Sequence, residues 1–276
     1  MSFLLCGKFR LPLDRPLVMG IVNVTPDSFS DGGMHASPSA ALEHALSLIE
    51  EGADMLDIGG ESTRPDASPV TVEQELRRVL PLVEALRGGS IPLSVDTSKP
   101  EVMRQAIAAG ASLINDVNAL RAPGALAAVA ASGVGACLMH RRGDPRTMQL
   151  APRYDDVAAE VGTFLGARLA AALDAGISRD RLLVDPGFGF AKNLQHNVEL
   201  LRHLDRFEAL GVPILAGLSR KSMLGAITGR EVGERLPASI AVAVLAVLKG
   251  AKVVRVHDVG ATKDALKIVS AIEGSE

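Results

Sequence analysis

The chain has 276 residues, close to the roughly 250 residues of a single (β/α)₈ barrel and too few for two full-sized domains. Hydrophobic residues make up 47% of the chain and charged residues 22%, which excludes an intrinsically disordered protein. The net charge is −3 and only 3% of the residues are aromatic. These values argue against a nucleic-acid partner, because binding one needs a basic surface or stacking aromatic residues.

The cysteine content and the apolar runs indicate where such a chain works. Two cysteines, Cys6 and Cys137, are too few for a disulfide framework or a cysteine-based zinc site. Cys137 lies in the apolar run 135–139, so we expect a small buried core residue rather than a reactive thiol. No basic N-terminal segment precedes a long apolar stretch, and the longest fully apolar run, 240–248, is too short to span a bilayer. We therefore expect a cytoplasmic protein that does not associate with membranes.

Eight short apolar segments recur along the chain and predict β-strands. They are continuously apolar rather than alternating, which is typical of parallel strands covered on both faces. The predicted strands are residues 17–22, 54–58, 91–95, 112–117, 134–139, 181–185, 212–218 and 252–257.

Helix signals occupy the segments between these strands. Residues 37–38 form a Ser-Pro pair, which predicts an N-cap followed by proline at the first helical position. Residues 71–74 and 98–101 both have the pattern of a capping box. Alanine-rich segments predict later helices over 157–175 and 236–248. The last of these is apolar almost all round, so we expect it to be buried in the body or in a subunit contact.

Eight alternating strands and helices predict a parallel sheet with right-handed crossovers. No linker or change of composition divides the chain, so we expect one domain over 1–276 with a core of about 16–272. Closed on itself, this sheet is an α/β TIM (β/α)₈ barrel. An open doubly wound sheet is the alternative, but the glycine-rich dinucleotide fingerprint is missing after the first strand.

Polar residues follow every predicted strand, at the end of a barrel where active sites gather. Burying so many charges costs several kcal/mol each unless they are paired or bound, so structural polarity alone does not explain them. The segments are residues 23–27, 57–65, 96–97, 115–116, 139–140, 185–190, 219–222 and 255–258.

One set of these residues suits a flat heterocycle with several N–H groups in one plane. Asp96, Asn115 and Asp185 offer acceptors and an amide at strand ends. A carboxylate meets an amidine-like edge through two charge-assisted hydrogen bonds. Lys221 and Arg255 complete the set by meeting a carbonyl or stacking on the ring.

Two further carboxylates, Asp57 and Asp116, are expected to be structural. Both lie close to glycines or helix caps, and each has a neighbour better placed for a ligand. Each would then cap a helix or neutralise a lysine inside the barrel.

A second set of residues is suited to anions. Arg64, Arg255 and His257 lie after the second strand and on the last one, and phosphate sites of this fold often lie around the last strands. Asn23 offers a neutral oxygen to a Mg²⁺ that already holds diphosphate oxygens. Ser222 follows the seventh strand at a helix start, where a hydroxyl and free N–H groups favour a carboxylate.

Two loops, 24–36 and 59–70, are long and punctuated by glycine and proline. Because they carry Asp27, Phe29, Thr63 and Arg64, we interpret them as lids over the site.

The motifs together resemble the dihydropteroate synthase family. The strings MGIVNVTPDSFSDGG (19–33) and DIGGESTRP (57–65) are similar to the two signature loops of that family. The resemblance extends over about 16–272. The other matching segments, in order, are residues 94–98, 114–116, 138–140, 185–190, 219–222 and 255–257.

This resemblance implies an enzyme that transfers an alkyl group. Family members condense 6-hydroxymethyl-7,8-dihydropterin diphosphate with 4-aminobenzoate, giving dihydropteroate and diphosphate by a dissociative substitution. The resemblance also implies Mg²⁺ as cofactor, small-molecule substrates, a homodimer and a target of sulfonamides.

The resemblance carries roles to individual positions. The residues implied to be catalytic are Asp96, Lys221, Arg255 and His257. Those implied to bind the pterin are Asp96, Asn115, Met139, Asp185, Lys221 and Arg255. Those implied to bind diphosphate are Asn23 (also the Mg²⁺ ligand), Arg64, Arg255 and His257. Those implied to frame 4-aminobenzoate are Thr63, Pro65, Phe190 and Ser222.

Two departures and two alternatives accompany the resemblance. Asp66 and Ala191 stand where the family usually has glycine, and Asp66 puts a charge beside the expected aminobenzoate edge. A pterin-binding methyltransferase module shares the barrel, but it should lack the motifs at 63–65 and 219–222 and would accompany a cobalamin-binding partner. A non-catalytic pterin-binding paralogue is the other alternative.

Overall fold

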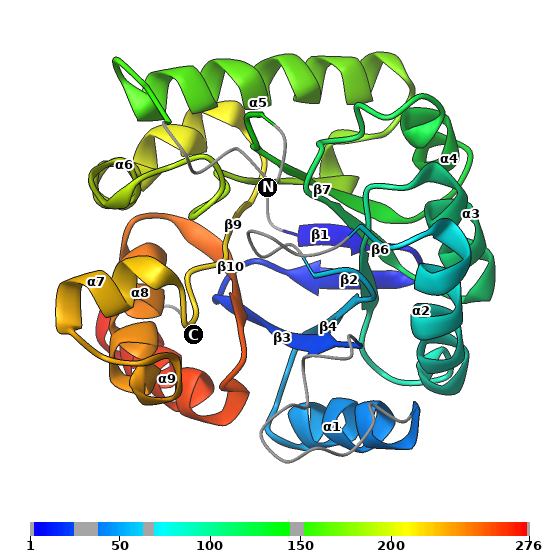
Figure 1. Ribbon diagram of the computed structural model, residues 1–276, viewed down its shortest axis with the longest axis horizontal. Helices are drawn as coiled ribbons and strands as arrows, with labels where there is room; N and C mark the ends of the chain where they lie inside the picture. The colour runs from blue at the N-terminus through cyan, green and yellow to red at the C-terminus, as the bar shows by residue number, and fades with distance from the viewer. Residues whose placement is uncertain (1–2, 25–37, 63–68, 144–151, 275–276) are drawn as a thin grey trace.

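The computed structural model describes residues 3–24, 38–62, 69–143 and 152–274. Eight parallel strands form a closed barrel in the order β10-β3-β4-β5-β6-β7-β8-β9, and helices surround it (Figure 1). The predicted α/β barrel is therefore confirmed, and the open sheet is excluded because β10 pairs with both β9 and β3.

All eight predicted strands form the barrel, with small differences at their ends. The strand predicted over 212–218 is observed as β9 (Ile214–Ala216), the shortest strand of the barrel. Pro213 has no N–H for the ladder, although its carbonyl still accepts a hydrogen bond from the N–H of Val184 at 3.0 Å. The barrel strands are β3 Leu17–Asn23, β4 Met55–Gly59, β5 Leu93–Asp96, β6 Leu113–Asp116, β7 Gly135–Met139, β8 Leu182–Asp185, β9 Ile214–Ala216 and β10 Ala251–Val256.

Helices connect successive strands as predicted, except that two α-helices, α7 and α8, lie between β9 and β10. The α-helices are α1 Pro38–Glu50, α2 Val72–Leu86, α3 Pro100–Ala109, α4 Ala125–Ala130, α5 Val157–Asp174, α6 Leu194–Arg202, α7 Ser222–Thr228, α8 Leu236–Leu248 and α9 Val259–Glu273. Short 3₁₀ helices are η2 Arg179–Arg181, η3 Leu204–Leu210 and η4 Val232–Glu234.

One predicted capping box is confirmed and one is wrong. At the start of α2, Thr71 Oγ1 accepts the N–H of Gln74 at 3.2 Å, and Gln74 Oε1 accepts the N–H of Thr71 at 3.0 Å. At α3, the N-cap is Lys99 rather than the residue before it, and no side chain caps the helix. The cause is Pro100, which holds the residue before it in the extended region. Helix α1 begins at Pro38, and the residue before it lies outside the described residues.

An N-terminal hairpin was not predicted. Strands β1 (Phe3–Cys6) and β2 (Phe9–Pro12) pair antiparallel around Gly7, whose φ of +58° suits a residue without a side chain. Four-residue strands give too short a pattern to recognise. Leu4 and Cys6 are buried with the apolar residues inside the barrel, so the hairpin closes its floor.

The barrel has two apolar regions because side chains of a strand alternate between its faces. Val18, Leu56 and Ile114 belong to the larger region between the sheet and the helices. Inside the barrel, the lower layer is apolar and is packed on the hairpin. This inner layer consists of Leu17, Met19, Met55, Leu113, Cys137, Leu183, Leu215 and Val253. Cys137 is buried in this layer, as predicted, and burial raises the pKa of its thiol well above the ordinary value.

Helix α8 is only partly buried in the body of the barrel, and burial in a subunit contact stays a prediction. Ser239, Val242 and Ala246 are buried, whereas the side chains of Leu245 and Leu248 are 46% and 52% exposed. Crossing a membrane takes a longer and more apolar helix than any in the described part of the chain.

Candidate active site

The next inward positions along the strands, toward their carboxyl ends, carry the predicted site residues. Strand register places Asp96 beside Gly59 on one side and Asn115 on the other. Met139 is level with Asp185, and Met139 is buried. The polar residues predicted from strand ends therefore form one layer inside the barrel, above the apolar floor.

Arg255 joins two carboxylates in this layer. Its Nε donates to Asp57 Oδ2 at 2.5 Å, and its Nη2 donates to Asp96 Oδ2 at 3.2 Å. Asp57 is fully buried and also accepts the Ser94 hydroxyl at 2.5 Å and the Asn115 amide at 3.1 Å. Saturated in this way, Asp57 orients the guanidinium, while Asp96 keeps acceptor capacity.

Asn115 presents an acceptor to the site. Its Nδ2 donates to Asp57, whereas its Oδ1 is buried and has no hydrogen-bond partner among the described residues. A buried carbonyl oxygen without a partner costs about 1–3 kcal/mol. An N–H group of a bound ligand would offset that cost.

Asp185 and Lys221 lie on the opposite part of the same layer. Asp185 Oδ1 accepts the N–H of Gly187 at 2.7 Å. A methyl group at Gly217 would lie 3.8 Å from Asp185 Oδ2 and 3.9 Å from Arg255 Cβ, so the missing side chain leaves space between the two. Lys221 Nζ donates to the carbonyl of Phe188.

The pKa values of Asp96, Asp185 and Lys221 are shifted by their surroundings in this layer. Burial, reinforced by the negative charge of Asp57, raises the pKa of Asp96 to about 7, and Arg255 opposes that rise. Burial also raises the pKa of Asp185, against the Gly187 hydrogen bond. Burial lowers the pKa of Lys221 to about 8, although Asp185 favours its charged form. Perturbed groups of opposite sign that converge inside a barrel are typical of a functional site.

His257 lies just beyond β10, two positions after Arg255, so both side chains are on the same face of the chain. Its Nδ1 is 3.0 Å from the hydroxyl of Ser219, which also accepts the His257 N–H at 3.3 Å. Ser219 was not among the predicted site residues. It restrains the imidazole ring at the mouth of the barrel.

Asn23 ends β3 at the same height as Asp96. A methyl group placed on Gly59 would lie 3.5 Å from Asn23 Oδ1 and 3.8 Å from Asp96 Cβ, so the carboxamide lies over Gly59 near the carboxylate. Among the described residues, no group of three His, Cys, Asp or Glu side chains could hold a metal ion.

The residues expected at the aminobenzoate end are partly described. The Phe190 ring centroid lies 4.5 Å from Lys221 Nζ, and Ser222 is exposed as the first residue of α7. The other two, Thr63 and Pro65, lie outside the described residues, as does Arg64 of the predicted diphosphate site. So do Asp66 and most of the predicted lid 24–36.

The expectation that two carboxylates are structural is right for one of them. Asp116 accepts the N–H groups of Asn118 and Leu120 at 2.7 and 2.8 Å and therefore stabilises a turn. Within the described part of the chain, Asp57 caps no helix and pairs with no lysine. Its partner is Arg255, so it belongs to the site.

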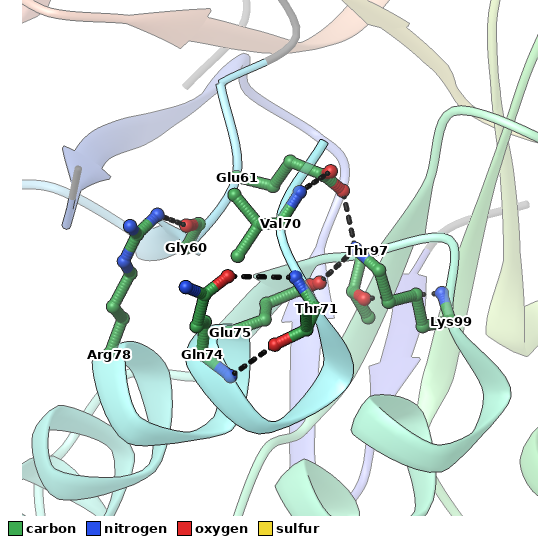
Figure 2. A network of polar contacts seen from close by, with 9 residues as sticks. All are labelled: Gly60, Glu61, Val70, Thr71, Gln74, Glu75, Arg78, Thr97 and Lys99. Atoms are coloured by element: carbon green, nitrogen blue, oxygen red, sulfur yellow. Dashed lines mark hydrogen bonds and ion pairs between the residues drawn. The ribbon is translucent and has the colours of Figure 1, made fainter. Parts of the chain in front are cut away.

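A partly buried ion-pair network, not predicted from the sequence, connects the segments around the starts of α2 and α3 (Figure 2). Lys99 Nζ donates to Glu61 Oε2 at 2.6 Å and to Glu75 Oε2 at 2.5 Å. Glu61 Oε1 also accepts the N–H of Val70 at 2.9 Å, which joins the two ends of the β4–α2 connection. The only sequence signal was a lysine next to a strand end.

A second unpredicted contact involves His140, which had no evident partner in the sequence. Its Nδ1 lies 3.0 Å from the amino group of Lys192, and both residues are buried. Lysine is rarely buried, and no local sequence pattern around Lys192, in the loop after β8, indicates that it is.

The chain is similar to known proteins in sequence and in fold. The family model for pterin binding enzymes matches residues 19–257. Dihydropteroate synthase from Escherichia coli (strain K12) is 52% identical over 262 residues, which cover 95% of this chain and 93% of that protein.

Solved structures agree with the sequence relatives. Xanthomonas albilineans dihydropteroate synthase with 4-aminobenzoic acid has a TM-score of 0.93 and 59% identity, covering 99% of this chain and 98% of that one. The complex of dihydropteroate synthase from the same organism with 7,8-dihydropteroate has a TM-score of 0.89 and 56% identity, covering 98% of each chain. The chain therefore belongs to the dihydropteroate synthase family of pterin-binding enzymes.

Proposed function

We propose that the protein condenses 6-hydroxymethyl-7,8-dihydropterin diphosphate with 4-aminobenzoate to give 7,8-dihydropteroate and diphosphate. The observation that carries this proposal is the inward layer of Asp96, Asn115, Asp185, Lys221 and Arg255, in a chain whose relatives bind 4-aminobenzoic acid and 7,8-dihydropteroate.

The inward layer suits the pterin ring. Asp185 and the unpartnered Oδ1 of Asn115 accept N–H groups at the polar edge, and Lys221 donates to the ring carbonyl. Arg255, held flat by two carboxylates, stacks on the ring, and Met139 lines the pocket. These interactions orient the methylene carbon toward the mouth of the barrel.

The reaction begins when the bond between the methylene carbon and the diphosphate oxygen breaks, and the electron pair leaves with the diphosphate. The dihydropterin carries the resulting cation by conjugation, and the Asp96 carboxylate offsets its charge. Arg255 and His257, together with Arg64, balance the departing diphosphate. The amine nitrogen of 4-aminobenzoate then bonds to the carbon and loses one proton.

The side-chain oxygen of Asn23 is a suitable ligand for a Mg²⁺ ion that is bound to a diphosphate. A neutral carboxamide oxygen beside Asp96 suits a cation that keeps most of its ligands as water and phosphate oxygens. When bound, Mg²⁺ would neutralise charge on the leaving group. We expect Asn23 to be its protein ligand.

The second substrate would bind at the rim. The Ser222 hydroxyl would meet the carboxylate of 4-aminobenzoate, and the Phe190 ring would pack on its aromatic ring. Thr63 and Pro65 would complete this subsite. The predicted lids, 24–36 and 59–70, would exclude water, which otherwise captures the cation.

Two properties of the whole protein complete the proposal. We expect a homodimer, because apolar side chains on α7, α8 and α9 are exposed. These three helices lie together on one side of the barrel (Figure 1). We expect a cytoplasmic location, consistent with two free, buried cysteines.

Diphosphate release tests the proposed function. The purified protein should release diphosphate only when the pterin diphosphate, 4-aminobenzoate and Mg²⁺ are all present. Tight pterin binding without aminobenzoate-dependent release would instead indicate a binding protein. Methyl transfer from a methylated pterin to a cobalamin protein would indicate the methyltransferase module.

Lys221→Ala tests the placement of the pterin. Lys221 Nζ contacts the carbonyl oxygen of Phe188 and the ring of Phe190, and we expect it to donate to the pterin carbonyl as well. Because the variant loses a charged hydrogen bond in a buried site, the affinity for the pterin should fall by about 100-fold. Titration calorimetry with the pterin diphosphate measures this. An unchanged affinity in the folded variant would place the pterin elsewhere.

A further inference from the structure

Lys192 is a buried lysine outside the residues assigned to the reaction. Its side chain is almost inaccessible, with 3% of the residue exposed. The amino group has three partners: the carbonyl oxygens of Gly187 and Phe190 at 2.9 and 3.0 Å, and His140 Nδ1 at 3.0 Å. An ammonium group has three N–H donors, so this site uses its full donor capacity.

Two of the three partners lie at the two ends of one short turn. The turn, residues 186–191, leads from β8 to α6. The carbonyl oxygens of Gly187 and Phe190 belong to the turn itself, whereas His140 belongs to the end of β7. Lys192 therefore ties the turn both to itself and to the neighbouring strand.

The backbone of this turn needs such restraint. Gly187 has a φ of +72°, and a methyl group there would lie 2.0 Å from the carbonyl oxygen of His140. Ala191 has a φ of +52°, in the left-handed region that costs a residue with a side chain about 1–2 kcal/mol. The departure from glycine at this position therefore adds strain. Strained turns persist where surrounding contacts hold them.

The same turn contacts Lys221, the lysine assigned to the reaction. The carbonyl oxygen of Phe188 accepts from Lys221 Nζ, and the Phe190 ring lies 4.5 Å from the same nitrogen. On its other side, the turn is anchored by Asn197, whose Oδ1 accepts the N–H of Gly189 at 2.7 Å.

The charge state of His140 suits its role as a partner. Burial and the nearby Lys192 lower the pKa of His140 to about 3, so the ring is neutral and its Nδ1 can accept a hydrogen bond. Burial lowers the pKa of Lys192 to about 7, while Asp185 favours and Lys221 opposes the charged form.

We propose that Lys192 is a positioning residue for the aminobenzoate side of the active site. By joining Gly187, Phe190 and His140, it keeps the turn in the conformation that presents the Phe190 ring and the Phe188 carbonyl to Lys221. The expected effect on catalysis rests on the proposed function. The claim that Lys192 holds the turn is independent of that function.

The positioning role predicts a selective kinetic effect. Asp185 is held by the strand ladder and by the Gly187 N–H, so its place depends less on Lys192 than that of Phe190 does. Lys192→Met keeps the length of the side chain and removes all three donors. We expect the KM for 4-aminobenzoate to rise about tenfold, while the affinity for the pterin diphosphate changes less than about threefold.

Two other variants separate positioning from stability. Lys192→Gln keeps two N–H donors and should recover part of the lost aminobenzoate KM. Phe207→Leu removes apolar contacts in η3, away from the turn, and should lower the melting temperature without changing either substrate constant. If Lys192→Met lowers only the melting temperature, as Phe207→Leu does, the positioning role is wrong.

Hydrogen exchange of the ligand-free protein gives a readout that does not depend on activity. In Lys192→Met, the amides of Gly189 and Phe190 should exchange faster than in the wild type and in Phe207→Leu. Unchanged exchange in the turn would overturn the inference. If the wild type itself released no diphosphate, the proposed function would fail, whereas exchange in the turn would still decide whether Lys192 holds it.

Discussion

Four aspartates at strand ends illustrate how position on a strand decides the role of a residue. Asp57, Asp96 and Asp185 occupy inward positions and share the charged layer with Arg255. Asp116 follows the inward Asn115 by one residue, so its carboxylate leaves the barrel interior and binds backbone N–H groups instead. A shift of one residue moves a side chain to the other face of the sheet.

The shifted pKa values predict a bell-shaped pH dependence. Asp96, with a pKa of about 7, must be ionised to offset the cation, and its ionised fraction falls as the pH drops below 7. Lys221, with a pKa of about 8, must be protonated to donate to the ring carbonyl, and its protonated fraction falls above 8. The kcat/KM for the pterin diphosphate should therefore be highest between about pH 7 and 8 and fall about tenfold per unit well outside it.

Steady-state rates from pH 5.5 to 9.5 measure this profile. Lys221→Arg keeps a positive charge at every pH in the range, so the basic limb should vanish even where its maximum rate is lower. A wild-type profile that stays flat from pH 6 to 9 would contradict the assignment of both groups.

At the scale of elements, the ion pairs around Lys99 connect three segments. Lys99 precedes α3, Glu75 lies in the first turn of α2, and Glu61 follows β4 (Figure 2). Glu75 is fully buried, so its charge depends on the lysine for compensation. The network fixes where α2 and α3 begin relative to the strand ends.

Lys99→Met should destabilise the protein by about 3–5 kcal/mol, because it leaves a buried carboxylate without its partner. Urea unfolding followed by circular dichroism measures the loss. The double variant Lys99→Met, Glu75→Gln removes both charges and should recover a large part of it. If the single and double variants lose the same free energy, the buried charge of Glu75 is not the cause.

At the scale of the molecule, the exposed apolar side chains gather on adjacent helices. Helix α8 packs against both α7 and α9, so their outer faces are continuous. The exposed apolar residues there are Ile227, Val232, Leu236, Leu245, Leu248, Ile268 and Ile272. An exposed apolar patch of this kind usually marks a protein contact.

The double variant Leu245→Glu, Leu248→Glu should convert the proposed dimer to a monomer, because two charges on each subunit would be desolvated in the contact. Sedimentation velocity measures the change in mass. Leu46→Glu is a matched control, since Leu46 is also 45% exposed but lies on α1, on another part of the barrel. A wild-type monomer, or a dimer that survives the double variant, would exclude this face as the interface.

Local patterns in the chain determined much of what the structure contains. Continuous apolar runs predicted the eight strands, and the residues that follow them predicted the site, because parallel strands bring their carboxyl ends to one edge. Helix α8 was predicted with the bounds that it has. The signature loops indicated the family before any geometry was known.

Tertiary structure alone decided which of the polar residues pair with one another. Asp57 and Arg255 are 198 residues apart and meet only because β10 closes the barrel against β3. Lys192 and His140 are 52 residues apart and are in contact because of a strained turn that no local pattern predicts. Periodicity along a chain determines which face a side chain occupies, but contacts between distant segments depend on the register of the closed barrel. That register follows from the packing of all the strands together.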